Sequence, residues 1–405
     1  SADNNLGRTY PAIFNHLETL ANTPGVNLLV LWDNQADSDS AYYHLQHDTH
    51  PSFIADYTEG ENFWPKGELD TGSSLTLSDF LIWGIQNYPA EHYALIMDDH
   101  GSGLGGGLCD DSGGNGCASK MSLAEMKLAL ATAHDVTGKK LDVLYMAMCL
   151  MGMIEDAYQF RDYTDYYVAS ENIQYTYTNY LPGLDASLSP AQLATLFASN
   201  YAGEMTTRNK AYTISVVDIA HLAPLVEAVD QLAVALLADI QAVAPALFNL
   251  GIAVQRYDNR APNGITPDDT YADLYDLASQ IHQTFSSHPN IVNAAQDVMT
   301  AVDTAVIYKS HASTAATNLN NSHGLSIFFP SNPSSFYYGE NNDFAAGTNW
   351  GNPLHGPTGE AIAWGPFVVA YIAETNPIGP DDATPPGPVA KAFDLFSIFL
   401  PVIIR

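Results

Sequence analysis

Cys149 and His100 are the two residues whose types and positions fit a nucleophile and its base. Each comes within three residues of the end of an apolar run, residues 141–148 for the cysteine and 93–97 for the histidine. A thiolate attacks acyl carbon atoms, and a neighbouring imidazole protonates the leaving amine and then activates water. The imidazole, and a helix expected to begin near Gly152, should increase the thiolate fraction of Cys149. The pair predicts a cysteine–histidine hydrolase site.

Both apolar runs have the length and composition of buried β-strands. The carboxyl ends of neighbouring parallel strands meet at one edge of an open sheet, which is where such sheets bind ligands. We therefore expect His100 and Cys149 to lie together there, with the backbone N–H groups of Gly101 and Cys149 as oxyanion donors. Taken singly, the cysteine also fits a buried inert thiol and the histidine a turn residue. Their matched positions favour catalysis.

Helical periodicity alternates with strand-like runs through the first half of the chain. A helix is predicted over 75–88 and another over 122–138, where Ser122 and Glu125 have the spacing of a capping box. This β-α-β-α-β order predicts an α/β fold with a parallel sheet covered on both faces. Further predictions are helices over 152–160, 190–204, 221–243 (ended by Pro245), 271–285 and 291–304, and strands over 26–33, 166–170, 213–217 and 324–330.

The length of 405 residues suits two or three domains, or one large α/β domain with an appendage. We expect a catalytic core over 1–205, a helical and strand elaboration completing the sheet over 206–378, and a Pro-rich linker with an apolar tail over 379–405. The tail is too short to span a bilayer and is either a docked strand or a sorting or attachment segment. The first residues lack a preceding strand, so we expect a removed leader and an extracellular or cell-surface protein.

The chain is strongly acidic. It has 14 Lys and Arg residues against 45 Asp and Glu residues, for a net charge of −31. Such a surface repels nucleic acid and anionic membranes, which excludes both as expected partners. The charge either attracts a cationic substrate or only confers solubility. No run of 18 apolar residues occurs, so no membrane span is predicted.

The three cysteines divide into a pair and a single thiol. Cys109 and Cys117 flank a loop of Gly, Asp, Ser and Asn residues, and a disulfide between them is expected in an exported protein. Cys149 is then the odd thiol, which fits a reactive role.

Several segments resemble the clostripain family of cysteine peptidases. Asp99 to Gly103 resembles the family's histidine motif, and Cys149 to Glu155 resembles its nucleophile motif. Similar segments run from residue 2 to about residue 375, at 2–6, 168–171, 215–218 and 324–330. The resemblance implies a caspase-like α/β/α sandwich with a mostly parallel central sheet and a helical C-terminal elaboration. It implies an endopeptidase that cuts after Arg or Lys. The family's first strand, which precedes residues 2–6, is absent from this chain.

The chain departs from the family at the specificity pocket. The family preference rests on an acidic residue two positions before the nucleophile, and here that position is Ala147. Ser170 and Glu171 complete the expected pocket. Either Glu171 supplies the missing carboxylate from the neighbouring strand, or the pocket prefers an apolar or neutral residue. Tyr175, Tyr177 and Tyr180 follow and either line the cleft or are ordinary half-buried aromatics.

The resemblance also implies activation by self-cleavage after a basic residue in the loop that follows the histidine. Lys120 is the only basic residue between His100 and Lys127. We expect a monomer, divided into two associated chains if this cut occurs, and a protein or peptide substrate. No cofactor is expected to be required; Asp33, Asp37 and Asp39 are weak calcium candidates. The competing hypothesis is a non-catalytic pseudopeptidase that binds peptides or a cell surface.

Overall fold

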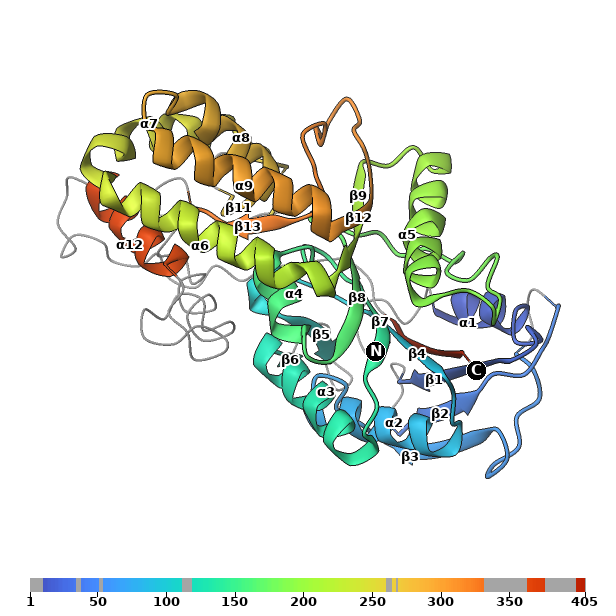
Figure 1. Ribbon diagram of the computed structural model, residues 1–405. Helices are drawn as coiled ribbons and strands as arrows, with labels where there is room; N and C mark the ends of the chain where they lie inside the picture. Colours follow the sequence, from blue (N-terminus) through green and yellow to red (C-terminus); the bar gives the residue numbers. More distant parts are fainter. Residues whose placement is uncertain are drawn as a thin grey trace.

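A nine-stranded sheet forms the centre of the protein (Figure 1). The computed structural model describes residues 10–33, 38–50, 54–110, 119–259, 264–266, 269–330, 363–375 and 398–404. The strand order across the sheet is β12-β9-β8-β7-β4-β14-β1-β2-β3. The strands are β1 (Val26–Trp32), β2 (Ser40–His44), β3 (Phe63–Gly67), β4 (His92–Asp98), β7 (Leu141–Ala147), β8 (Thr164–Ala169), β9 (Tyr212–Asp218), β12 (Val306–Ala312) and β14 (Ile398–Ile404).

The sheet is mixed, which corrects the prediction of a mostly parallel one. Only β4 with β7 and β7 with β8 are parallel neighbours. The hairpin partners β2 and β3 and the strand β9 pair antiparallel with their neighbours. Strand β14, formed by the apolar tail, lies antiparallel between β1 and β4. Strands β4, β7 and β8 nevertheless point the same way, so their carboxyl ends share one edge.

Helices cover both faces of the sheet, giving the α/β/α layers of the predicted fold class. Successive side chains of a strand point to opposite faces, so the core is divided into two clusters. One cluster, the α1/α5 face, includes Ile96, Tyr145 and Ala147. The other, the α2/α3 face, includes Met97 and Met146. The covering helices are α1 (Tyr10–Glu18) and α5 (Pro190–Thr207) on the first face, and α2 (Ser74–Asn87), α3 (Leu123–Thr137) and α4 (Ile154–Phe160) on the second.

Helix α3 begins and ends where the sequence predicts. The Ser122 hydroxyl accepts the Glu125 N–H while the Glu125 carboxylate accepts the Ser122 N–H, so both members of the capping box are formed. Gly138 closes the helix in the left-handed conformation, with φ +66°. These caps fix the ends of the helix that leads into β7.

The C-terminal elaboration is a helical layer on a small sheet. Its strands β10 (Arg256–Tyr257), β11 (Tyr271–Asp273) and β13 (Ser326–Phe328) are antiparallel. Its helices are α6 (Leu222–Ala238), α7 (Ile240–Ala253), α8 (Leu274–Thr284), α9 (Pro289–Ala305) and α12 (Trp364–Thr375), with the 3-10 turn η2 (Ile219–His221) before α6. Strands β9 and β12 join the central sheet, so the sheet crosses the expected boundary at residue 205.

Two helix predictions in this region are wrong. The helix expected over 221–243 breaks at Asp239, and Pro245 lies inside α7 instead of ending a helix. Pro245 is the sixth residue of α7, so the helix continues past it without the backbone hydrogen bond that an N–H at this position would donate. The helix expected over 271–285 begins only at Leu274, because Asp273 caps it by accepting the Asp276 N–H at 2.7 Å.

One helical stretch of the described residues, Ile219–Ala238, is long and apolar enough to cross a membrane by length and composition. Half of that apolar window is buried inside the protein. Leu225, Val229, Leu232 and Leu236 belong to the core. Packing against the neighbouring helices therefore accounts for its apolar character.

Candidate active site

The structure brings the His100 segment against Cys149. Strands β4 and β7 are parallel, with Asp98 opposite Ala147. Two residues further on, this register puts His100 level with Cys149. A Cβ atom placed on Gly101 would lie 2.5 Å from the carbonyl oxygen of Cys149 and 2.9 Å from its nitrogen. Only glycine fits this contact, so the backbone at Gly101 lies directly against that of Cys149.

A small hairpin fixes the backbone after His100. The His100 carbonyl accepts the Leu108 N–H at 3.0 Å, and Ser102 donates its N–H to Gly106 at 2.9 Å. The 3-10 turn η1 (Gly103–Gly105) lies between these bonds, and β5 (Gly107–Asp110) pairs with β6 (Ser119–Met121). The hydroxyl of Tyr271, from the elaboration, donates to the Ser102 carbonyl at 2.8 Å. Hydrogen bonds from the core and from the C-terminal elaboration therefore both position the loop that follows His100.

The turn after Cys149 is equally constrained. Leu150 has a φ of +67°, an unfavourable conformation for a side chain of this type. Its N–H donates to the Asn172 carbonyl at 3.1 Å, and the Gly152 N–H donates to the Ser170 carbonyl at 2.8 Å. A Cβ on Gly152 would lie 2.6 Å from the nitrogen of Glu171. Strained backbone held in this way clusters at functional sites.

The thiol of Cys149 is buried and paired with the backbone of Gln174. Its Sγ accepts the Gln174 N–H at 3.3 Å and lies 3.5 Å from the Gln174 carbonyl oxygen. Burial raises the pKa of Cys149 to about 11; the Gln174 N–H opposes the shift and the charge of Asp98 adds to it. The predicted gain in thiolate is therefore not found in this resting state, because desolvation outweighs the donors near the sulfur.

Two of the predicted pocket positions, Ala147 and Ser170, lie side by side at one edge of the sheet. Ala147 ends β7, and one residue beyond the Met146–Ala169 pair the register puts Ser170 beside it. The Ser170 hydroxyl lies 2.9 Å from the Thr213 hydroxyl and donates to the Asn172 carbonyl at 3.0 Å. Asp98 is the register partner of Ala147 on the other side. Asp98 cannot be singled out from the sequence alone, because strand register is not visible in a single sequence.

Glu171 has its contacts on the other side of the sheet from Ala147. Its carboxylate accepts the Gly324 N–H at 3.0 Å, and it is almost fully buried. Burial raises the pKa of Glu171 well above its usual range, and the nearby Asp273 raises it further. Tyr257, which also contacts this carboxyl, belongs to the α2/α3 cluster. Glu171 thus connects the segment that follows β8 to the C-terminal elaboration.

Tyr177 and Tyr180 are fully buried in a cluster of tyrosines on the α1/α5 face. Their rings stack obliquely with centroids 4.0 Å apart. The Tyr177 hydroxyl donates to that of Tyr145 at 3.2 Å, and the Tyr180 hydroxyl donates to the Asp98 carboxylate. Tyr175 is only partly buried, and its N–H donates to the Tyr201 hydroxyl at 3.0 Å. The cluster contacts Asp98 through the Tyr180 hydroxyl and Gln174 through the Tyr145 hydroxyl.

Lys120 is exposed on β6, opposite Cys109 in the pairing with β5. Its Nζ would lie 3.2 Å from a Cβ placed on Gly105, so the side chain extends over the histidine loop. Cys117 lies outside the described residues, as does the side chain of Cys109, so the predicted disulfide stays a prediction.

The calcium candidates are only partly described. Asp33 is buried and its carboxylate accepts the Ser40 hydroxyl, while Asp37 lies outside the described residues. Asp39 lies just before β2. Within the described ranges, no group of three or more His, Cys, Asp or Glu side chains is arranged to hold a metal ion. Calcium binding in this loop stays a prediction.

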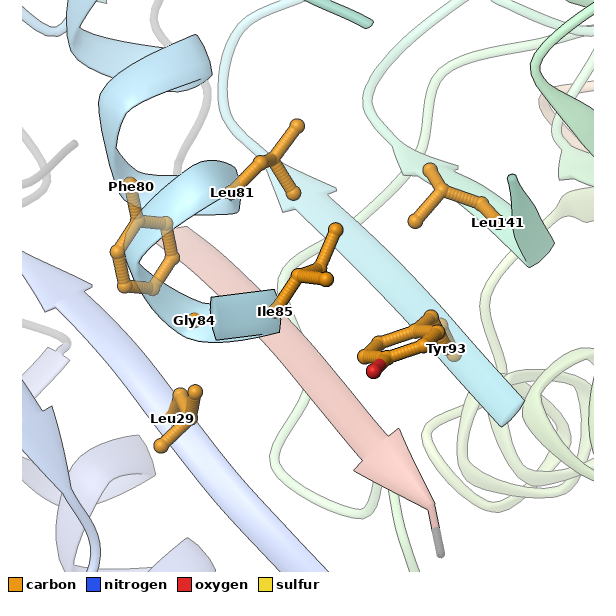
Figure 2. A pocket seen from close by; sticks show the side chains of 8 residues that line it. Leu29, Phe80, Leu81, Gly84, Ile85, Tyr93 and Leu141 are labelled. Atoms are coloured by element: carbon orange, nitrogen blue, oxygen red, sulfur yellow. The ribbon is translucent and has the colours of Figure 1, made fainter. Parts of the chain in front are cut away.

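A small apolar cavity lies away from this site. It has a volume of about 10 Å³ and is bordered by α2 together with Leu29, Tyr93 and Leu141 (Figure 2). Tyr93 and Leu141 lie at the amino ends of β4 and β7, at the opposite end of the strands from His100 and Cys149. A cavity of this size holds one water at most. It is a packing gap and does not bind a substrate.

An α/β/α fold whose thiol and imidazole segments meet at the carboxyl ends of parallel strands is the arrangement of a caspase-like cysteine peptidase. The model of the clostripain family matches residues 1–356, and the chain belongs to this family. Clostripain of Hathewaya histolytica is 26% identical over 408 residues, which cover 83% of this chain and 75% of that protein. The chain is accordingly a cysteine endopeptidase, and its substrate is a peptide or protein.

Solved structures show the same fold. A secreted C11 cysteine protease from Bacteroides thetaiotaomicron, in complex with an irreversible peptide inhibitor, has a TM-score of 0.58 and 17% identity, over 86% of this chain and 97% of that one. An inactive zymogen C11 protease from Parabacteroides distasonis has a TM-score of 0.57 and 19% identity, over 81% and 89% of the two chains. The predicted fold class is confirmed, with the sheet mixed as described above.

Proposed function

We propose that Cys149 is the nucleophile of this endopeptidase and His100 its general acid and base. The observation that carries the proposal is the contact of Gly101 with the backbone of Cys149, at the end of two strands in parallel register. The N–H groups of Gly101 and Cys149 are the proposed oxyanion donors. Glycine at 101 allows the donor backbone to approach without a side chain.

The raised thiol pKa requires the proton to move during attack. In the resting state Cys149 is a neutral thiol at physiological pH. His100 accepts the Sγ proton as the sulfur bonds to the carbonyl carbon, and the oxyanion is held by the two N–H groups. The same proton then passes to the leaving amine as the C–N bond breaks. Water, deprotonated by His100, releases the acyl group, and the thiol recovers its proton.

Cleavage of a diverse peptide mixture, read by mass spectrometry, tests these roles. Cuts made by the wild type should vanish in Cys149→Ala and fall at least about 100-fold in His100→Ala, the loss expected for a general acid and base. His92→Gln is the matched control, because His92 lies at the other end of β4, beside Asp142. Cuts that persist in Cys149→Ala would overturn the assignment. No cuts by any form would favour the pseudopeptidase.

We also propose self-cleavage after Lys120. The support is its exposure and its position on the hairpin that holds the His100 backbone. A cut there frees the histidine loop on one side, which links cleavage to activation. Intact-mass measurement during storage should show two fragments for the wild type and one species for Lys120→Gln and for Cys149→Ala. Fragments in Cys149→Ala would indicate a contaminating protease.

We further propose that the enzyme is secreted and monomeric. A relative of the same fold is described as secreted, and the net charge of −31 keeps copies of the chain apart. Fractionation of producing cells and light scattering test these two statements. The calcium prediction for Asp33, Asp37 and Asp39 is tested by thermal unfolding with calcium and with a chelator.

A further inference from the structure

Asp98 lies where its carboxylate could contact the substrate side chain that precedes the scissile bond. It is the last residue of β4 and the register partner of Ala147, two residues before Cys149. Neighbouring strands lie about 4.8 Å apart. Ile96 belongs to the α1/α5 cluster, so alternation directs Asp98 to the same face as Ala147. Ser170, the residue that follows β8, continues this row.

Asp98 lies in a buried polar cluster of tyrosine side chains. The residue is 1% exposed, and its carboxylate accepts the hydroxyl of Tyr180. Tyr145 and Tyr177 complete the polar cluster below it. Glu171, the other carboxylate considered for the pocket, has its contacts on the opposite face. A buried carboxylate is costly unless a cation or several donors compensate it.

We propose that Asp98 is the specificity-determining residue of this chain, binding the Arg or Lys side chain that precedes the scissile bond in place of an acid at position 147. The inference rests on the proposed peptidase activity of Cys149 and His100. In the absence of substrate, the Tyr180 hydroxyl is a donor to this carboxylate. Tyr180 lies in the irregular segment between β8 and α5, so a substrate side chain can displace it without unpairing a strand.

The position of Asp98 also couples recognition to the nucleophile. Its negative charge contributes, after burial, to the raised pKa of Cys149. A guanidinium or ammonium group bound at Asp98 neutralises that charge and favours the thiolate when a cognate substrate is present. A substrate with a neutral side chain gives no such relief. The acid therefore opposes ionisation of Cys149 in the resting enzyme and loses that effect when substrate binds.

The test compares four peptides that differ only in Arg, Lys, Gln or Leu before the scissile bond. For the wild type, kcat/KM should be highest for Arg and Lys. In Asp98→Asn it should fall at least about 100-fold for the basic peptides and change only a few-fold for Gln and Leu. The double variant Asp98→Ala, Ala147→Asp, which moves the carboxylate to the adjacent strand, should restore part of the basic preference. Glu171→Gln is the control and should keep the wild-type ratio.

A second measurement separates recognition from a merely structural role. Removing the charge in Asp98→Asn should make alkylation of Cys149 by iodoacetamide several-fold faster at pH 8, while cleavage of basic peptides becomes slower. Tyr180→Phe, which removes the competing donor, should retain or increase cleavage of basic peptides.

Four outcomes would overturn the assignment: a wild type without basic preference, an unchanged ratio in Asp98→Asn, parallel losses in alkylation and in all cleavage, or a Tyr180→Phe variant that loses basic preference. If the wild type cuts neutral peptides through Cys149, the proposed function stands while this inference fails. If it cuts nothing, both fail.

Discussion

Gly101→Ala is the substitution that most directly tests the geometry of the site. The new Cβ would lie 2.5 Å from the Cys149 carbonyl oxygen, 2.7 Å from the Met148 Cβ and 2.9 Å from the Cys149 nitrogen. Ordinary van der Waals contact begins at 3.4 Å, so the two segments must separate by about 0.9 Å (3.4 − 2.5). The blocking atoms are mostly backbone and cannot rotate away.

A displacement of about 1 Å between reacting groups costs about 100-fold in rate. We therefore expect kcat/KM for peptide cleavage to fall by about that factor in Gly101→Ala, because His100 and the oxyanion donor move away from Cys149. The assay is cleavage of a fluorogenic peptide, with circular dichroism and thermal unfolding to show that the fold persists.

Gly203→Ala is the matched control. Gly203 lies in α5 and has no atom within 4 Å of its added Cβ. Alanine there should keep full activity and stabilise the helix by about 0.5–1 kcal/mol. Wild-type kcat/KM in Gly101→Ala would refute the reasoning, since it would mean that the two segments are not in contact as described.

Three further predictions concern the buried groups. Because the pKa of Cys149 is raised to about 11, its alkylation in the resting protein should be slower at pH 7 than that of a free cysteine peptide and should accelerate up to about pH 11; a fast reaction at pH 6 would contradict this. Burial raises the pKa of Glu155 to about 8 from 4.5, so its contribution to stability is full below pH 4.5 and is lost as the pH rises through 8. For this one group, urea unfolding should show a fall of up to about 1.4 kcal/mol per pH unit. Glu155→Gln should make the total fall smaller, although the buried Asp156 and Glu171, whose pKa values are also raised, still contribute to it; an equal slope in both proteins would contradict the assignment. Arg256 is buried and donates to the carbonyls of Gly251, Asp269 and Phe329, so Arg256→Met should lower the free energy of unfolding by about 3 kcal/mol. The exposed Lys139→Met should change it by less than about 0.5 kcal/mol, and equal effects would count against the role of Arg256.

The strands that precede His100 and Cys149 could be predicted because their signals are local. Apolar runs before the two residues mark buried strands, and the Ser122–Glu125 box with Gly138 bounds the helix in the connection between them. Helix length and the rule for parallel strands then bring the two residues to one edge. None of these steps requires knowledge of a distant contact.

The parts that could not be predicted depend on long-range pairing. The apolar run of β14 is the same whether it docks or stays free, and only the sheet shows that it lies between β1 and β4. The role proposed for Asp98 depends on its register with Ala147, which a single sequence does not show. The thiol pKa follows from burial, which depends on the Gln174 segment and not on the residues beside Cys149 in sequence.

The most direct test of the central claim is to trap the nucleophile. The intact protein is treated with a peptidyl chloromethyl ketone, and the labelled residue is found by peptide mapping. The account predicts a single label on Cys149, formed at least about 100-fold more slowly in His100→Ala. Labelling at another residue, or labelling of Cys149 at the same rate without His100, would contradict it.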